Sequence, residues 1–378
     1  MNQRFALPLV SIGALTLPVH ADDQPVTEMA TVEVTAPMKA EAPASAVPVT
    51  VLTGEDLQLK IGHSIGETLN SEAGVTSQSF GPGVGMPVIR GQTGPRVRVL
   101  NNAIGSNDVS QLSPDHAVSV EPILAERIEV LRGPSTLRYG SGAIGGVVNV
   151  IDNRIPEQTS DRLVGGAFAQ RYDSAANEST TALKIEGGKS HLAYHLDGFY
   201  RDRDNLSIGG MAIDELAAYS IDPTLPVPLQ NSHGVLPNTS AHAISGSAGL
   251  SLVGDPGFAG VAINRLENNY GVPPDGGGGP NVRIDLQQTK YDFNSELIQP
   301  LSWVEALRMR LGYTDYQHTE YDGALPGTAY SSQTYEGRME LVHQALGPLH
   351  GSVGFQAIAS DFSAVEWWIY LLPKISNA

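Results

Sequence analysis

The adjacent pair Asp115 and His116 is the part of the sequence best suited to chemistry. A carboxylate oxygen and an imidazole nitrogen are both ligands that zinc and other divalent transition metals accept. Neighbouring side chains point to opposite faces of a regular strand, so these two can share an ion only on a turn, which Pro114 favours. The alternative is ordinary turn chemistry, in which Asp115 caps local backbone amides. The residues alone leave both interpretations open.

The sequence offers little support for an enzyme. It contains no nucleophile elbow, no Walker loop and no HExxH string. Ser135, His116 and Asp115 supply the residue types of a hydrolytic triad, but nothing in the sequence positions them together. The chain has no cysteine, which excludes disulfides and thiolate metal ligands. A formal net charge of −17 argues against nucleic acid as a partner.

Residues 1–47 combine two sequence signals. Arg4, a short apolar stretch and small residues at its end predict a secretory signal peptide over residues 1–21, the alternative being a buried helix. Residues 22–47 are acidic and rich in Pro and Ala, which predicts a flexible arm. Within the arm lies a short β-prone run that could add as a strand to the open sheet edge of a partner. This run consists of Thr31, Val32, Glu33, Val34, Thr35 and Ala36.

Residues 48–153 have the pattern of a mixed α+β domain. Thr53 is a candidate N-cap followed by acidic residues, and Ser64 with Glu67 has the spacing of a capping box, so two short helices are expected. Residues 128–151 predict a strand, a break at Gly133 and Pro134, a Gly/Ser-rich turn, and a β-branched strand from residue 143. Glycines in that last run are expected where another backbone comes close.

Residues 161–362 alternate apolar and polar side chains in segments of about ten residues, as transmembrane barrel strands do. In one segment the two faces consist of Leu307, Met309, Leu311 and Tyr313 against Arg308, Arg310 and Thr314. A soluble β-sandwich would also alternate, but its dry core would not accept repeated charges. Tight turns at 187–190, 254–257 and 346–349 alternate with longer loops at 201–241 and 268–283, the rhythm of outer-membrane barrels.

Several strings together resemble one family. PVIRGQTG at 87–94, RVRVLNN at 96–102, ERIEVLRGP at 126–134 and the whole of 128–151 resemble the plug domain of TonB-dependent outer-membrane receptors. The resemblance implies a mixed α+β plug domain followed by an antiparallel transmembrane β-barrel. It also implies that the run Thr31–Ala36 is a TonB box, which binds the TonB energy-coupling protein. The implied location is the outer membrane of a Gram-negative bacterium, in contact with lipid, after removal of the signal peptide.

With SPDHAVSVEP at 113–122, these strings resemble most closely the zinc-uptake branch of the family. That resemblance implies that Asp115 and His116 bind metal, with zinc as transported ligand and no tightly bound cofactor. Two departures weaken it: residues 270–282 lack the His-rich loop common in that branch, and residues 323–330 contain no acid. The spacing of the remaining candidates does not show that they converge; these are His195, His233, His242 and His318. A siderophore or other metal chelate therefore stays open as cargo, as does a passive receptor without energised transport.

The C-terminal region predicts an incomplete barrel. About nine strands can be counted, whereas plugged outer-membrane transporters have about 22. An open sheet with unpaired edges is unfavourable in hydrocarbon. Residues 366–378 lose the alternation, which suggests a frameshift or insertion. We therefore expect a chain that is inactive alone, either a receptor remnant or one half of a split receptor.

Overall fold

The computed structural model describes residues 49–274, 276 and 281–367. All of them belong to one compact unit. The predicted signal peptide at 1–21, the predicted TonB box at Thr31–Ala36 and residues 368–378 of the predicted tail lie outside the described residues. In the part of the chain that is described, no helix has the length and apolar character needed to cross a membrane.

The N-terminal part of the described chain is built on a five-stranded sheet with the order β1-β6-β7-β4-β5. Strands β4 and β7 pair in parallel, whereas the other neighbours are antiparallel. The core beneath this sheet is apolar and includes Leu52, Leu57, Ile89, Ile128 and Val148. The strands are β1 Val49–Thr53, β4 Val97–Asn101, β5 Ile104–Gly105, β6 Arg127–Leu131 and β7 Gly146–Ile151, and a separate hairpin consists of β2 Val75–Ser79 and β3 Gly85–Ile89.

The segment 128–151 forms two strands, as predicted, but its centre differs from the prediction. The expected turn is largely a 3-10 helix, η3 Gly133–Tyr139, and the second strand begins at Gly146 rather than at residue 143. A Cβ at Gly145 would lie 2.5 Å from the Cβ of Gln92, so there is no room for a side chain directly before β7. The same Cβ would lie 3.0 Å from the carbonyl oxygen of Arg96, so the expected close approach of another backbone is confirmed at this glycine.

Both predicted helices are present, and only one is capped as expected. In α2 (Ile65–Thr68) the Ser64 side chain accepts a hydrogen bond from the Glu67 amide at 3.2 Å. The Glu67 carboxylate reaches past Ser64 to the amide of His63, at 2.7 Å, so the capping box is only half formed. Thr53 occupies the N-cap position of α1 (Gly54–Lys60) without capping it, because its hydroxyl donates to the carbonyl of Glu126 instead.

The C-terminal part is one antiparallel sheet of nine strands, ordered β18-β17-β16-β15-β14-β13-β10-β9-β8. The predicted alternation is confirmed: on β16, Arg308 and Thr314 are buried while Leu311 is 46 % exposed on the other face. Among the described residues the sheet is open, with β8 and β18 at its edges. The strands are β8 Gly165–Asp173, β9 Glu178–Lys189, β10 Leu192–Arg203, β13 Ala241–Gly254, β14 Gly257–Gly271, β15 Val282–Leu301, β16 Val304–Asp322, β17 Leu325–His343 and β18 Ser352–Glu366.

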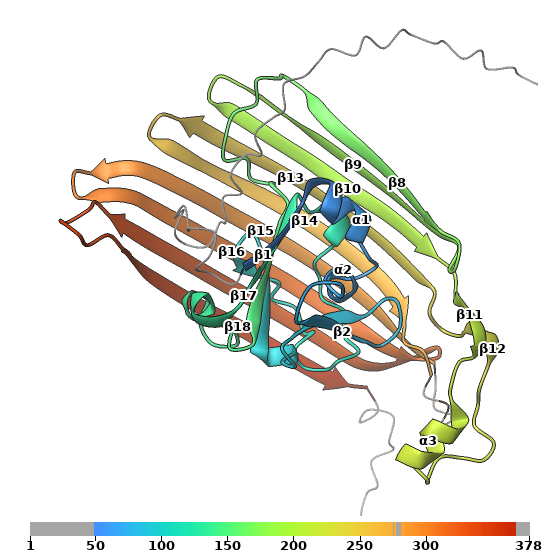
Figure 1. Ribbon diagram of the computed structural model, residues 1–378. Coiled ribbons are helices and arrows are strands. Elements are labelled where there is room, and N and C mark those ends of the chain that lie inside the picture. Colours follow the sequence, from blue (N-terminus) through green and yellow to red (C-terminus); the bar gives the residue numbers. More distant parts are fainter. Residues whose placement is uncertain (1–48, 275, 277–280, 368–378) are drawn as a thin grey trace, which may run out of the picture. The chain divides into compact units, whose positions relative to one another are not determined.

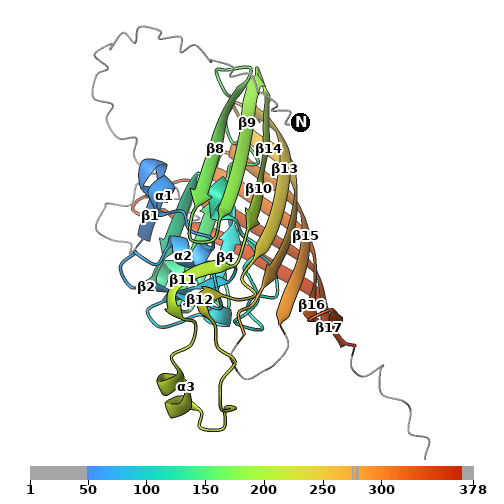
Figure 2. The ribbon, with the colours of Figure 1, turned by 90° about the vertical axis from the view of Figure 1, so that its right-hand side faces the viewer.

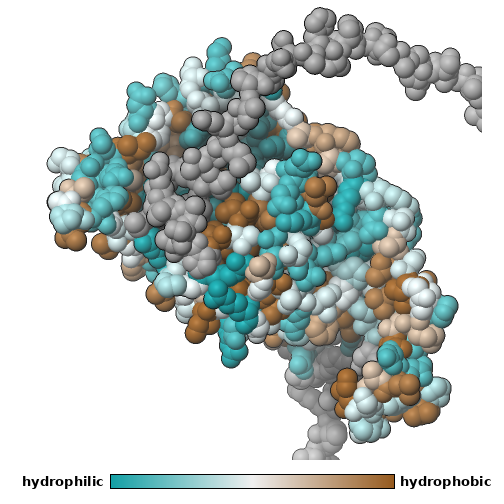
Figure 3. All heavy atoms as spheres, viewed as in Figure 1, coloured by the Kyte–Doolittle hydropathy of each residue, from teal (hydrophilic) through white to brown (hydrophobic). Residues whose placement is uncertain are grey.

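The connections follow the predicted rhythm with one shift. The turn expected at 187–190 lies at Ser190 and His191, because β9 continues through both glycines to Lys189. The long loop predicted at 201–241 connects β10 to β13 and contains two strands and a helix. These are β11 Leu206–Met211, α3 Glu215–Ile221 and β12 His233–Leu236. Figure 3 shows apolar side chains on the surface of this connection, where Leu216 is 86 % and Ile221 is 84 % exposed on α3.

The mixed α+β part lies against one face of the nine-stranded sheet (Figures 1 and 2). Polar contacts join the two: Arg98 pairs with Glu336 at 3.1 Å, and the Lys290 ammonium donates to the carbonyl of Gly105 at 3.0 Å. A shared apolar cluster includes Val109 from the first part and Leu286 from the sheet. These contacts hold the connection between β5 and the 3-10 helix η2 (Pro122–Leu124) next to strands β14 to β17.

Candidate metal centre

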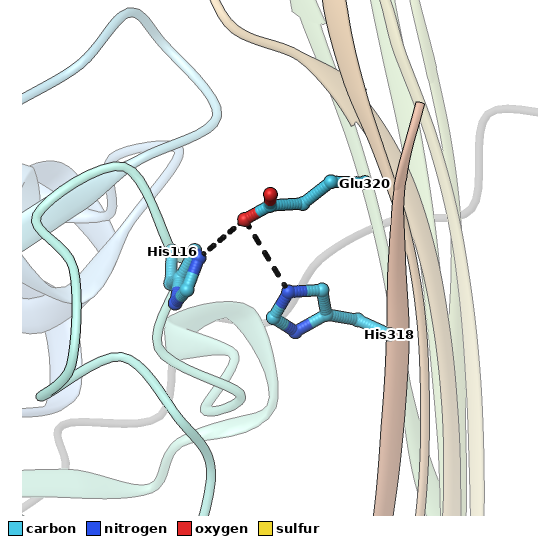
Figure 4. Close-up of side chains that lie close together, drawn as sticks. All are labelled: His116, His318 and Glu320. Carbon is cyan, nitrogen blue, oxygen red and sulfur yellow. Dashed lines mark hydrogen bonds and ion pairs between the residues drawn. The ribbon is translucent and has the colours of Figure 1, made fainter. Parts of the chain in front are cut away.

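His116 lies in the connection between β5 and η2, which contains no helix or strand. Its amide closes a turn by donating to the carbonyl of Ser113 at 3.3 Å. Its side chain is 1 % exposed and points toward the nine-stranded sheet (Figure 4). The turn that the sequence predicted at Pro114 is therefore what places this imidazole against the sheet.

His318 and Glu320 come from strand β16, close to its end at Asp322. Residues two apart on a strand share a face, so both side chains lie on the face that also carries the buried Thr314 and Tyr316. This face is turned toward the mixed α+β part (Figure 4). The alternation seen in the sequence thus delivers a histidine and a glutamate to the same side of the sheet as His116.

The three side chains converge. Nε2 of His116 lies 2.8 Å from Oε1 of Glu320, and Nε2 of His318 lies 3.8 Å from the same oxygen. One donor atom from each residue lies within 4.8 Å of the others. Zinc holds nitrogen and oxygen ligands at about 2.0–2.2 Å, so donors of one ion lie a few ångströms apart, as these do. The arrangement can therefore offer two imidazole nitrogens and one carboxylate oxygen to a single cation.

The second nitrogen of each imidazole is already engaged. Nδ1 of His116 donates to the carbonyl of Val109 at 3.1 Å, because a carbonyl oxygen can only accept. Nδ1 of His318 lies 2.8 Å from the hydroxyl of Tyr316. Such outer hydrogen bonds fix the orientation of a metal-binding imidazole and leave Nε2 directed at the ion. The ring of Tyr330 covers both histidines, with its centroid 4.4 Å from His318 and 5.2 Å from His116.

Charge within the cluster favours a cation. Burial disfavours the charged imidazole of His116, but the hydrogen bond to Glu320 and the carbonyl of Val109 outweigh it and raise the pKa of His116 above its usual value. The carboxylate of Glu320 thus stabilises a proton on Nε2 of His116. A divalent ion would take the place of that proton, since the nitrogen must be unprotonated to act as a ligand.

Of the two predicted metal ligands, His116 is brought into this cluster and Asp115 is not part of it. Asp115 points elsewhere on the turn, where its carboxylate accepts from the Ser113 hydroxyl. Its role in metal binding stays a prediction. Among the four further histidines considered from sequence, His318 joins His116, whereas His195 pairs with Asp197 on β10 and His242 is half-exposed beside Asp202.

Sequence inspection missed Glu320. A carboxylate from the barrel was expected at residues 323–330, whereas Glu320 lies just before them on β16. The signal that was present is the spacing of His318 and Glu320, which puts two metal ligands on one face of a predicted strand. That His116 lies next to this pair follows only from the fold and could not be predicted from spacing.

Comparison with known proteins agrees with the fold. Residues 42–147 match the family model for the TonB-dependent receptor plug domain. Among solved structures, the copper transporter OprC superposes with a TM-score of 0.67 at 14% identity, covering 84% of this chain and 46% of that protein.

Two further solved structures have the same fold. The siderophore receptor PirA from Pseudomonas aeruginosa gives a TM-score of 0.58 at 18% identity, covering 85% of this chain and 49% of the receptor. The hemophore receptor HasR of Serratia marcescens, solved with its hemophore and heme, gives 0.61 at 15% identity, covering 83% and 45%. The chain thus spans less than half the length of each of these three proteins.

Residues 42–147 thus match a TonB-dependent receptor plug domain, and this chain shares its fold with part of each of the three solved proteins. Its mixed α+β part is the plug, and its nine-stranded antiparallel sheet corresponds to part of a TonB-dependent barrel. The cluster of His116, His318 and Glu320 lies where these two parts of the chain meet.

Proposed function

We propose that this chain serves the TonB-driven uptake of a divalent transition-metal ion, with zinc as the cargo, across the outer membrane. The observation that carries the proposal is the convergence of His116 from the plug with His318 and Glu320 from β16. Two nitrogens and one oxygen from protein, with a fourth position left for water, form a ligand set that zinc commonly takes. Copper and nickel accept imidazole as well and are the main competitors.

Burial favours a bare ion over a metal chelate. His116 and His318 are 1 % and 2 % exposed, and the Tyr330 ring packs on both. A siderophore brings its own ligands to the metal and would need a wide, polar cavity instead of free imidazoles. The absence of cysteine from the chain removes the thiolate that would favour monovalent copper. The names of the similar structures span copper, siderophore and heme, and they do not select one cargo.

The division of the site between plug and barrel suggests how the cargo would be released. His116 belongs to the plug, whereas His318 and Glu320 belong to the barrel wall. Movement of the plug would separate the ligands and lower the affinity for the ion. In this proposal the arm 22–47 transmits the force, with TonB pairing to the run Thr31–Ala36, after a signal peptide at 1–21 has directed the chain to the outer membrane.

The test is a set of calorimetric titrations of the full chain in detergent with zinc, cobalt, nickel and a ferric siderophore. The proposal predicts one tight zinc site per chain, weakened when Asp115 and His116 are both replaced by alanine. A parallel Asp115→Ala variant separates the two residues. Binding of the ferric siderophore with no tight zinc site would instead favour the chelate as cargo and would exclude the zinc proposal.

A further inference from the structure

Tyr270 places its hydroxyl between the two peptide groups that flank His116. The hydroxyl accepts a hydrogen bond from the amide of Ala117 at 2.8 Å and donates one to the carbonyl of Asp115 at 3.4 Å. Tyr270 lies at the end of β14, in the barrel wall, and is fully buried. It is not one of the three converging metal ligands. A barrel residue thus holds the backbone of a plug ligand from both sides.

The ring of Tyr270 is fixed by packing. It belongs to the apolar cluster that also contains Val84 and Val109 of the plug and Tyr316 of β16. Gly83 of the plug lies so close that a Cβ there would be 3.2 Å from the Cβ of Tyr270. Because the ring has little room to move, the position of its hydroxyl is set by the fold and not by the turn that it binds.

The turn that carries His116 is held by single hydrogen bonds and not by a regular ladder. Residues between β5 and η2 form no helix or strand, so no regular ladder pairs their amides and carbonyls. Within the loop, the amide and Nδ1 of His116 donate to the carbonyls of Ser113 and Val109. The carboxylate of Asp108 accepts from the amides of Ser110 and Ser119. The carbonyl of Asp115 and the amide of Ala117 are instead paired with the one hydroxyl of Tyr270.

We infer that Tyr270 is the positioning residue of the metal centre, which holds His116 in register with His318 and Glu320. The expected effect of Tyr270 on metal affinity rests on the proposed function. Its expected effect on the turn around His116 rests on the geometry alone. Removal of the hydroxyl takes away the partner of the buried Ala117 amide and of the partly buried Asp115 carbonyl. The turn is then free to shift to recover these hydrogen bonds. Such a shift would move Nε2 of His116 away from His318 and Glu320, so that the three side chains could no longer bind one ion.

The test uses the full chain with Tyr270→Phe, which keeps the packed ring and removes only the hydroxyl. The matched control is Tyr313→Phe, on β16 but on the opposite face, where its ring stacks on Tyr291 and Tyr335. Zinc affinity is expected to fall about tenfold or more in Tyr270→Phe, the usual cost of losing an outer partner of a metal ligand, and to stay unchanged in Tyr313→Phe.

A double-mutant cycle separates positioning from general stability. If Tyr270 acts through His116, the change Tyr270→Phe should cost nothing further in a His116→Ala background, where His318 and Glu320 remain. An equal loss in both backgrounds would overturn the inference, because it would mean that the hydroxyl stabilises the protein rather than the position of His116. No loss of zinc affinity in either background would overturn it as well.

Hydrogen exchange in the metal-free protein keeps the inference testable whatever the cargo is. Faster exchange confined to the amides around His116 and Ala117 is expected in Tyr270→Phe, because the Ala117 amide loses its acceptor. Unchanged exchange at these amides would refute the positioning role directly. If His116→Ala leaves zinc affinity unaltered while Tyr270→Phe still speeds exchange, the proposed function fails and the role of Tyr270 in holding the turn stands.

Discussion

Replacement of His318 by alanine is expected to weaken zinc binding by more than about 100-fold, the upper end of what loss of an outer partner costs a metal site. The change removes one of two imidazole ligands and leaves Glu320 with a single nitrogen beside it. A loss of that size corresponds to about 2.8 kcal/mol of binding free energy. Competition titration with a chromogenic zinc chelator would measure it, since it covers a wide range of affinities.

The matched control for His318→Ala is His242→Ala. His242 lies on β13 of the same sheet, and its side chain is 50% exposed beside Asp202, outside the converging cluster. Its loss should leave zinc affinity within the error of the titration. Equal affinities in His318→Ala and the unaltered chain would mean that zinc, if it binds, does so elsewhere.

Deletion of residues 31–36 is expected to abolish both zinc uptake and binding to the periplasmic domain of TonB, while zinc affinity stays unchanged. The run offers TonB only a backbone edge for strand addition, so its removal eliminates the pairing without touching the metal ligands. Binding to TonB is measured by calorimetry on the purified chain. Because this chain is expected to be inactive alone, uptake of radioactive zinc is measured in cells where the deletion is placed in a full-length parent receptor that serves as their route for zinc.

A deletion of the same length at residues 38–43 serves as the control, because it shortens the arm and keeps the run intact. This control should bind TonB as the unaltered chain does. Uptake at the normal rate by the 31–36 deletion would show that transport does not depend on TonB. A drop in zinc affinity would place part of the metal site in the arm.

The sequence was most informative where a pattern is local. Alternation along 307–314 correctly separated the two faces of β16, and a short stretch around Pro114 was correctly expected to turn. Local patterns could not show that Thr53 fails to cap α1. Its hydroxyl donates instead to the carbonyl of Glu126, which is far away in the sequence. Tertiary contacts override capping preferences in such cases.

The candidate metal centre could be predicted only in part, because it joins residues separated by 204 positions in the sequence. His116 was found from its own surroundings. The pairing of Asp115 with His116 stays a prediction, and in this structure the Asp115 carboxylate accepts from the Ser113 hydroxyl. Pairing His116 with β16 required the register of the strands and the seating of the plug, which depend on contacts such as Arg98 with Glu336. Neither can be read from spacing in one sequence.

X-ray absorption at the zinc edge of the zinc-loaded full chain tests the central claim most directly. The account predicts a first shell of two imidazole nitrogens at about 2.0–2.1 Å with oxygen ligands, and the multiple scattering that imidazole rings produce. In the variant with His116 and His318 both replaced by alanine, the imidazole signal should disappear. A zinc shell of oxygen ligands alone in the unaltered chain, or an imidazole signal that persists in the double variant, would contradict it.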